Sequence, residues 1–370
     1  EMHQSVEKTA QELDLEDLLD HAPGELSGGQ KQRVSMAGVM IDRVEILLFD
    51  EPLANLDPAS GKRTIDLIDR IQKNDHTTIV IIEHRLEDVL YRDVDRIIVI
   101  GDGKIAADMT PDALLTTSVL EAEGIRKPLY LTACKYMDIP VLEERKPQHV
   151  ETFDLTGMEG KAQKWYQEAP VQSRHQEGET LLELQQVGFG YLPGQQVLQN
   201  ISFQVKKGEM LSIVGKNGAG KSTMSSLICG FLTPTEGHMI YRGQDMKNWS
   251  IKERGEKIGF VMQSPNQMIS KPMIFDEVAL GLVIRQIPEA EIKERVNQVL
   301  KICGLYEMRN WPVSALSFGQ KKRVTIASIL VMEPEMMILD EPTAGQDYRH
   351  YTEIMEFLKK LNQEAGITIM

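Results

Sequence analysis

Two stretches of this sequence carry residue types that suit phosphate chemistry. The first reads Gly-x-x-x-x-Gly-Lys-Ser and follows the apolar run LSIV. Glycines let backbone N–H groups curl around phosphate oxygens, while Lys221 can reach the terminal phosphates and the Ser222 hydroxyl can ligate Mg²⁺. We expect a strand that runs into this loop and a helix that begins at Lys221. The loop comprises Gly215, Lys216, Asn217, Gly218, Ala219, Gly220, Lys221, Ser222 and Thr223.

The second stretch is the apolar run MMIL, which ends in Asp340 and Glu341. An acid at the end of a buried strand can hold Mg²⁺ through water, and the next acid can polarise an attacking water. The same pattern occurs at Asp50 and Glu51. Together with the glycine-rich loop, these carboxylates predict phosphoryl transfer.

Three more residues border apolar, strand-like runs. Gln263 follows IGFVM and could contact Mg²⁺ and the attacking water, or be an ordinary loop residue. His84 follows TTIVIIE; a lone histidine is usually structural, but this run comes one helix after the Asp50 run, as in sheets that gather functional residues at the carboxyl ends of their strands. Tyr191 could stack on adenine or be an ordinary strand aromatic.

The motifs occur twice, because LSGGQKQRV recurs as LSFGQKKRV and EILLFDEPLANLD recurs as EMMILDEPTAGQD. A constant offset without insertion or deletion indicates two copies of one module. The separation is 290 residues for the pairs Ser27 and Ser317, Asp50 and Asp340, and Asp57 and Asp347.

The offset also indicates which parts of each copy lie within residues 1–370. Subtracting it from Lys221 places the first copy's phosphate loop about 70 positions before residue 1. Adding it to His84 places the second copy's histidine at position 374, beyond Met370. We therefore expect a fragment truncated at both ends, which carries the back of one module and nearly all of another.

Composition limits the classes of function. With 370 residues the chain is long enough for two or three domains, and its net charge of −14 argues against a surface that grips nucleic acid or anionic lipid. The three cysteines lack the spacing of a disulfide framework or zinc site, which favours reduced, buried thiols. No apolar run approaches the ~20 residues needed to span a bilayer, so we expect any membrane contact to be made through a partner.

Taken in order, the glycine-rich loop, Gln263, LSGGQ, the acidic strand end, the following aspartate and the histidine resemble the ATP-binding cassette (ABC) family. The resemblance implies an α/β fold of P-loop NTPase cassettes, each with a mixed sheet core and a helical signature subdomain, in two tandem copies. It implies ATP hydrolysis with Mg²⁺. Its catalytic residues would be Glu341, Glu51, His84 and Gln263, and its metal ligands Ser222, Gln263, Asp340 and Asp50.

In this family two cassettes face each other head to tail, so that each ATP lies between one phosphate loop and the LSGGQ of the other cassette. The family's adenine-stacking role then falls on Tyr191. The resemblance further assigns nucleotide contacts to Ser27, Gly29, Gln30, Ser317, Gly319, Gln320, Asp57 and Asp347. We expect this fragment to bind one ATP and hydrolyse it poorly.

More narrowly, GIRKPLYLTACKYMDIP, EPTAGQD and QSPNQM are similar to energy-coupling factor (ECF) importers with two ATPases fused in one chain. That resemblance implies uptake of a vitamin, a vitamin precursor or a transition-metal ion, and a location on the cytoplasmic face of the cell membrane. It implies two partners, a membrane-embedded T component and a substrate-binding S component. The coupling surface would be the segment after Gln263, including DEVALGLVIRQIP, although this segment could equally be a packed helical subdomain.

The resulting domain hypothesis has three parts: the C-terminal part of a first cassette at 1–110, a post-cassette segment and linker at 111–180, and a second cassette at 181–370. Residues 144–178 have loop composition and little periodicity, which predicts a linker. Within it, Trp165 and Tyr166 could dock on a domain surface or belong to a short helix.

Two alternatives and one departure remain. An ABC-F type translation factor also fuses two cassettes, but it carries a long basic helical linker, whereas residues 144–178 are acidic to neutral and interrupted by proline and glycine. A fused sugar-importer ATPase shares the mechanism and differs in its membrane partner. The departure is Phe318, which stands where the first copy has Gly28 and leaves Ser317 and Gly319 in place.

Overall fold

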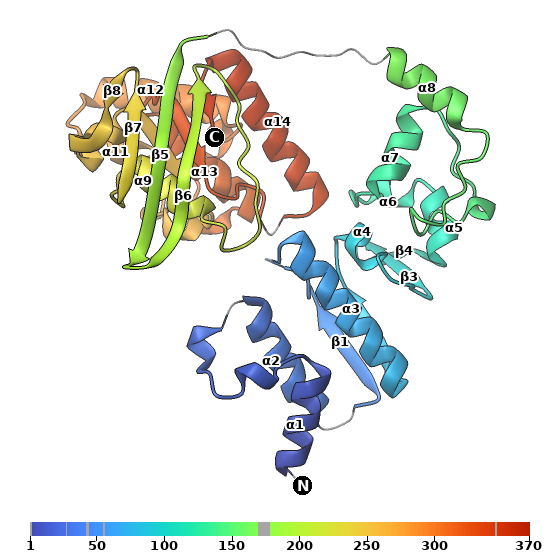
Figure 1. The fold of residues 1–370 in the computed structure, drawn as a ribbon. Coiled ribbons are helices and arrows are strands. Elements are labelled where there is room, and N and C mark those ends of the chain that lie inside the picture. The colour runs from blue at the N-terminus through green and yellow to red at the C-terminus, as the bar shows by residue number, and fades with distance from the viewer. Residues whose placement is uncertain (1, 27, 42–43, 55, 169–177, 345) are drawn as a thin grey trace. The chain divides into compact units, whose positions relative to one another are not determined.

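The computed structural model describes residues 2–26, 28–41, 44–54, 56–168, 178–344 and 346–370. The chain divides into two compact units (Figure 1). Unit 1 comprises Glu1–Gln172 with Asp347–Arg349, and unit 2 comprises Ser173–Gln346 with His350–Met370. Each unit mixes helices and strands, which confirms the expected α/β class.

Unit 2 contains two sheets. One is antiparallel with the strand order β6-β5-β7-β8, and the other is parallel with the order β11-β10-β9. All four residues of β10 are buried, as expected for a strand inside a parallel sheet covered on both faces. The strands are β5 (Thr180–Leu192), β6 (Gln195–Lys206), β7 (Glu236–Tyr241), β8 (Gln244–Asp245), β9 (Ile258–Val261), β10 (Met336–Leu339) and β11 (Thr368–Ile369).

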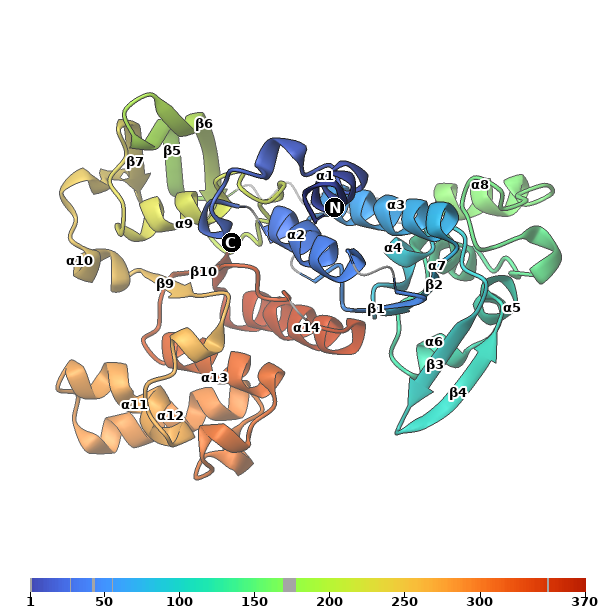
Figure 2. The same cartoon turned by 90° about the horizontal axis from the view of Figure 1, so that it is seen from below.

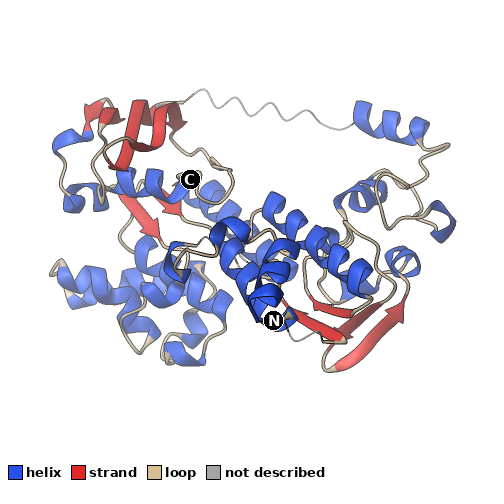
Figure 3. Ribbon diagram, turned by 60° about the horizontal axis from the view of Figure 1, so that its bottom comes forward, coloured by secondary structure: helices blue, strands red, loops and turns tan. Residues whose placement is uncertain are grey.

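The helices of unit 2 pack in two groups, each with its own core. One core joins the antiparallel sheet to α9, and the other joins α11, α12, α13 and α14 to the parallel strands. Figure 2 shows α11, α12 and α13 gathered on the side of β9 and β10 away from β5 and β7, and Figure 3 separates the strand-rich part from this helical part. The helices are α9 (Lys221–Cys229), α10 (Ile251–Gly255), α11 (Ile274–Ile284), α12 (Glu289–Ile302), α13 (Phe318–Leu330) and α14 (Tyr348–Ala365).

Unit 1 also has two cores. β1 and β2 form a parallel pair packed with α1, α2 and α3, while the antiparallel pair β3 and β4 packs with α5, α6 and α7. The strands are β1 (Ile46–Asp50), β2 (Thr78–Ile82), β3 (Ile97–Gly101) and β4 (Lys104–Met109). The helices are α1 (Met2–Glu12), α2 (Gly28–Met40), α3 (Pro58–Asp75), α4 (Leu86–Val89), α5 (Pro111–Thr116), α6 (Val119–Ala122), α7 (Leu129–Tyr136) and α8 (Glu159–Glu168).

Helix bounds repeat at the offset of the motifs. Adding 290 to the bounds of α2 and α3 gives those of α13 and α14. The short 3-10 helices at Glu16–Leu18 and Pro23–Glu25 correspond in the same way to Tyr306–Met308 and Val313–Ala315. Register agrees as well, since β1 pairs Ile46 with Thr78 and β10 pairs Met336 with Thr368.

The predicted linker at residues 144–178 contains helical structure. Residues 159–168 form α8, so Trp165 and Tyr166 belong to a short helix, which was one of the two alternatives. Phe153 and Met158 are buried in the core of β3, β4 and α7, and the Tyr130 hydroxyl donates to the carbonyl of Gln148 at 3.0 Å. Isolated apolar residues attach this segment to the core. Because they are isolated, the sequence shows no hydrophobic periodicity that would predict this packing. Residues 169–177 lie outside the described part of the chain.

Two smaller expectations concern the cysteines and the membrane. Cys134, Cys229 and Cys303 are buried and free, as expected, and burial raises the pKa of the Cys229 and Cys303 thiols to about 12. Among the helices in the described part of the chain, none has both the length and the apolar character needed to cross a bilayer.

Candidate nucleotide site

The glycine-rich loop of unit 2 leads into α9, which begins at Lys221 as predicted. The strand expected before the loop does not form as a continuous strand, and a single isolated β-bridge is found there instead. Met210 pairs with Ile369, and the Leu211 amide donates to the Ile369 carbonyl at 2.8 Å. Because β11 comprises only Thr368–Ile369, the residues between Leu211 and Gly215 have no described strand on this side with which to form a ladder.

The backbone of this loop requires glycine at two positions. Gly218 and Gly220 have φ angles of +78° and +90°, which residues with a Cβ rarely adopt. A Cβ on Gly220 would also lie 2.6 Å from Leu198 Cδ2 in β6. The loop therefore keeps a conformation that leads directly into the first turn of α9, and the backbone amides at the start of a helix can stabilise a phosphate.

Four predicted side chains converge beside the loop, from three different elements. Ser222 Oγ in α9 donates to Asp340 Oδ1 after β10 at 3.1 Å. Gln263 Nε2 after β9 donates to Glu341 Oε2 at 2.7 Å. The parallel register of β9 and β10 brings the ends of these strands to one edge of the sheet. Sequence spacing alone left the role of Gln263 open, and its contact with Glu341 places it within this cluster.

Lys221 lies between the loop and the acidic pair. Its Nζ donates to the carbonyls of Gly215 at 2.8 Å and Lys216 at 3.1 Å, and lies 4.0 Å from Glu341 Oε1. If Lys221 Nζ turned toward a phosphate, it would lose two neutral carbonyl acceptors and gain a charged acceptor. Hydrogen bonds to a charged acceptor are stronger. Lys221 is thus already placed at the mouth of the loop.

The donor set beside the loop fits Mg²⁺. Ser222 Oγ and Asp340 Oδ1 are 3.1 Å apart, close to the ~2.9 Å that separates adjacent ligands of an octahedral ion with bonds of 2.0–2.1 Å. No cluster of three or more His, Cys, Asp or Glu suited to a metal occurs among the described residues. The Ser222 hydroxyl and the Asp340 carboxylate match the way Mg²⁺ is usually held, by one or two protein oxygens together with substrate phosphates.

Tyr191 lies at the end of β5 near α9. Its hydroxyl is 3.2 Å from Thr223 Oγ1, its ring meets Phe189 edge-on at 5.0 Å between centroids, and the residue is 60% exposed. A largely exposed aromatic ring that is held by an aromatic neighbour and through its hydroxyl is suited to stacking on a base.

We expect Tyr191→Ala to weaken ATP binding by about 5- to 100-fold, because a stacked base contributes ~1–3 kcal/mol. Tyr191→Phe should retain most of the affinity, since it removes only the contact with Thr223. Calorimetric titration with ATP and with inorganic triphosphate checks this. A loss for triphosphate as large as that for ATP would exclude stacking.

In unit 1 the corresponding acidic pair lies beside the histidine. His84 Nδ1 is 3.7 Å from Glu51 Oε1 and 3.7 Å from Glu83 Oε2. Asp50 and Glu51 end β1, and His84 follows β2, its parallel neighbour. The backbone φ is +47° at Glu51 and +45° at Glu341, so both glutamates follow their aspartates through the same left-handed turn.

The signature residues lie at the starts of α2 and α13. Ser317 caps α13 by accepting from the Gln320 amide at 3.3 Å, while the Gln320 side chain accepts from the Ser317 amide at 2.9 Å. Gly319 lies in the first turn, and Phe318 is 43% exposed beside it. Gly29 and Gln30 occupy the matching turn of α2, and Ser27 lies outside the described residues.

The later aspartates precede α3 and α14. Asp57 caps α3, because its Oδ1 accepts from the Ser60 amide at 2.9 Å and its Oδ2 from the Ser60 hydroxyl at 3.0 Å. Asp347 directly precedes α14. This geometry gives Asp57 a helix-capping role that sequence analysis did not identify.

Three buried charged residues near these motifs were missed. Glu83, with a side chain 2% exposed, accepts from the amides of Leu53, His84 and Arg85 at 2.9–3.1 Å. Lys322 and Glu277 are buried in unit 2. Burial lowers the pKa of Lys322 to about 8, while Asp340 and Glu341 oppose that shift. For Glu83 and Glu277 the available signal was a charge beside apolar residues, whereas Lys322 lies among other polar residues and gives no such signal.

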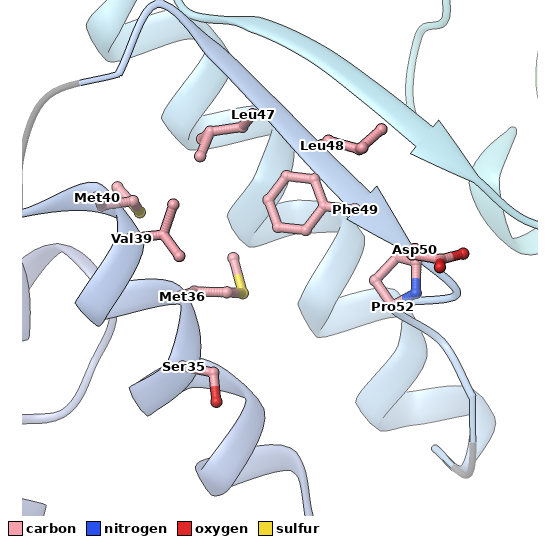
Figure 4. Close-up of a pocket in the computed structure, with 9 residues that line it drawn as sticks. All are labelled: Ser35, Met36, Val39, Met40, Leu47, Leu48, Phe49, Asp50 and Pro52. Atoms are coloured by element: carbon pink, nitrogen blue, oxygen red, sulfur yellow. The ribbon is translucent and has the colours of Figure 1, made fainter.

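A pocket of about 210 Å³ between α2 and β1 is lined mostly by apolar side chains. Figure 4 shows Met36 and Val39 of α2 facing Phe49 of β1. At the offset of 290, Val39 corresponds to Ile329 in unit 2, where β9 packs so closely that a Cβ on Gly259 would lie 2.2 Å from Ile329 Cγ2. The pocket in unit 1 is therefore equivalent in position to β9 of unit 2. It is not equivalent to the phosphate loop of unit 2.

Comparisons with known proteins agree with this geometry. The family model described as ABC transporter matches residues 1–54 and 198–344, and one described as ATP-binding cassette cobalt transporter matches residues 117–189. A protein of Enterococcus faecalis whose name describes an ABC transporter ATP-binding protein is 57% identical over 371 residues, and one of Clostridium perfringens with a similar name is 55% identical over 370. Each alignment covers 100% of this chain and 65% of the relative, so the chain spans about two-thirds of their length.

Among solved structures, cbiO1 of Clostridium perfringens, described as part of the ABC transporter complex cbiONQ, aligns with a TM-score of 0.50 and 39% identity. The alignment covers 52% of this chain and 77% of that one. Cassettes of this kind bind and hydrolyse ATP. The family model covers more than half of the residues and the phosphate loop meets the acidic strand end, so the chain belongs to the ABC transporter family of ATP-binding proteins.

Proposed function

We propose that this protein is the ATP-hydrolysing subunit of an importer for a vitamin, a vitamin precursor or a transition-metal ion. The observation that carries the proposal is the convergence of Ser222, Asp340, Gln263 and Glu341 beside the glycine-rich loop. Phosphoryl transfer needs these components within one cluster: a phosphate cradle, oxygen ligands for a metal, and a carboxylate that positions water.

The proposed division of labour follows from these contacts. Lys221 and the loop amides bind the phosphates of ATP, and Tyr191 stacks on the adenine. Ser222 and Asp340, with Gln263, would hold Mg²⁺, which neutralises phosphate charge when bound. Glu341 accepts the proton of the attacking water, and Gln263 orients its carboxylate through the 2.7 Å hydrogen bond. Asp50, Glu51 and His84 supply the equivalent groups in unit 1.

We further propose that the protein carries two cassettes in tandem, with the boundaries 1–110, 111–180 and 181–370. The matching bounds of α2 and α13, and of α3 and α14, support this. The left-handed backbone conformation shared by Glu51 and Glu341 supports it as well. In the ABC family, which this chain belongs to, each ATP is bound by one phosphate loop and one signature. The signature groups would be Ser27, Gly29, Gln30, Ser317, Gly319 and Gln320, with Asp57 and Asp347 alongside.

The importer assignment rests on the similarity of residues 117–189 to a cobalt transporter family and on the cbiO1 neighbour. The partners would be a membrane-embedded T component and a substrate-binding S component, which would place the protein on the cytoplasmic face of the membrane. Leu282 of α11 is buried, whereas Val283 and Ile284 at the end of the helix are 55% and 71% exposed. This end of α11, with Val283, offers apolar surface to a helix of the T component.

Affinity purification of the intact protein from solubilised membranes of its source, followed by mass spectrometry, tests the assignment. We expect a small polytopic membrane protein and an S component to copurify, and Val283→Asp with Ile284→Asp to reduce their recovery. A matched pair of substitutions on an exposed polar face, Lys359→Asp with Glu356→Lys, should leave recovery unchanged. Ribosomal proteins in place of membrane partners would overturn the proposal and favour a translation factor.

A further inference from the structure

Lys322 is a buried ammonium within the helix that follows the signature. It lies in the second turn of α13 and is 1% exposed. Burying an ammonium is costly unless acceptors replace the lost water. Its Nζ donates to the carbonyls of Gln263 at 2.5 Å and Met262 at 3.3 Å. The charge of Lys322 is therefore directed at the backbone of the residue that meets Glu341.

A second buried charge holds the other end of the same loop. Glu277 in α11 is 5% exposed, and its Oε2 accepts from the amides of Ser270 at 2.8 Å and Lys271 at 2.7 Å. The loop that joins β9 to α11 is thus hydrogen-bonded near both ends by buried side chains of opposite charge. Lys322 binds carbonyls and Glu277 binds amides, so each charge meets backbone groups of the opposite polarity.

The two helices that supply these charges pack closely. A Cβ on Gly281 in α11 would lie 2.7 Å from Met332 Sδ, directly beyond α13. Both helices belong to one hydrophobic core. A displacement of α13 would therefore carry the loop with it, because a close-packed core transmits small shifts with little compliance.

On the basis of the proposed function, we infer that Lys322 is a positioning residue that fixes the Gln263 backbone and thereby sets the contact between the Gln263 amide and Glu341. Ser317 caps α13, the helix that carries Lys322, and hydrogen bonds then run from Lys322 to the Gln263 carbonyl and from the Gln263 amide to Glu341. This arrangement joins the signature of unit 2 to the catalytic carboxylate of the same unit. The first copy has Gln32 at the corresponding position, so this ammonium distinguishes the two modules.

The test compares Lys322→Met with Lys322→Arg and with Lys359→Met, an exposed lysine on α14. In the intact protein, we expect Lys322→Met to lower kcat by about 10- to 100-fold, the range that follows when a catalytic group is misplaced by about 1 Å. The Kd for ATP should change less than about 3-fold, because the hydrogen bonds of Lys322 go to the carbonyls of Met262 and Gln263. Lys322→Arg should restore part of kcat, and Lys359→Met should match the parent.

A double-mutant cycle separates positioning from general stability. If Lys322 acts through Gln263, the variant with both Lys322→Met and Gln263→Ala should be no slower than Gln263→Ala alone. If the fold-loss in kcat of the double variant equalled the product of the fold-losses of the two single variants, the inference would be overturned. If Lys322→Met does not fold, Lys322→Gln takes its place in the cycle, since glutamine occupies this position in the first copy. A parent protein without ATP turnover would instead contradict the proposed function.

Discussion

Replacing Lys221 with methionine is expected to weaken ATP binding by about 10- to 150-fold. A hydrogen bond to a charged group contributes ~1.5–3 kcal/mol, and the ammonium would make at least one such bond to the phosphates. Methionine keeps the unbranched chain and removes the charge. The loop itself should persist, because its shape depends on the left-handed glycines Gly218 and Gly220.

Calorimetric titration with MgATP measures this loss directly. Lys207→Met, an exposed lysine of unit 2 outside the loop, is the matched control and should bind ATP like the parent. The phosphate origin of the effect can be checked with adenosine, whose binding Lys221→Met should leave nearly unchanged. Undiminished ATP affinity in Lys221→Met would show that the phosphates bind elsewhere.

In the intact protein, replacing Glu341 with glutamine should have the opposite profile, with ATP binding kept and turnover lost. The change removes the carboxylate that accepts a proton from water, while the glutamine oxygen can still accept from Gln263 Nε2. General base catalysis contributes about 10²- to 10⁴-fold, so kcat should fall by that order. The charge removed also lies 4.0 Å from Lys221 Nζ, which should make ATP binding equal or tighter.

Single-turnover hydrolysis and retention of labelled ATP after rapid desalting report the two halves of this prediction. Glu356→Gln, an exposed glutamate on α14, serves as the control for loss of one negative charge. Retained nucleotide should be ATP in Glu341→Gln and ADP in the parent. A kcat equal to that of the parent would remove Glu341 from the catalytic role and leave Gln263 without a function at this carboxylate.

The sequence predicted those parts of the site whose chemistry is tied to short spacing. The loop from Gly215 to Thr223 and the pairs Asp340 with Glu341 and Asp50 with Glu51 follow from local patterns, and the helix predicted at Lys221 begins there. Repetition at 290 residues also anticipated matching helices. Such features are local or periodic, so one chain is enough to read them.

The parts that could not be predicted depend on contacts between distant segments. Lys322 is 59 residues from Gln263, and nothing in LSFGQKKRV shows which of its two lysines is buried. Glu83 follows an apolar run and looks like a polar strand end until its three backbone donors are seen. The packed residues around Phe153 were missed because their apolar side chains are isolated in sequence and meet only in the core.

The left-handed backbone at Glu51 and Glu341 has a consequence for how these positions tolerate change. A residue with a Cβ at such a φ costs on the order of 1 kcal/mol relative to glycine, so each glutamate is kept at the expense of thermal stability. A library selected for heat resistance alone should therefore drift toward glycine or asparagine at both positions. Its most heat-resistant members would be those that had lost turnover, so the selection must also include ATP hydrolysis if it is to keep both glutamates.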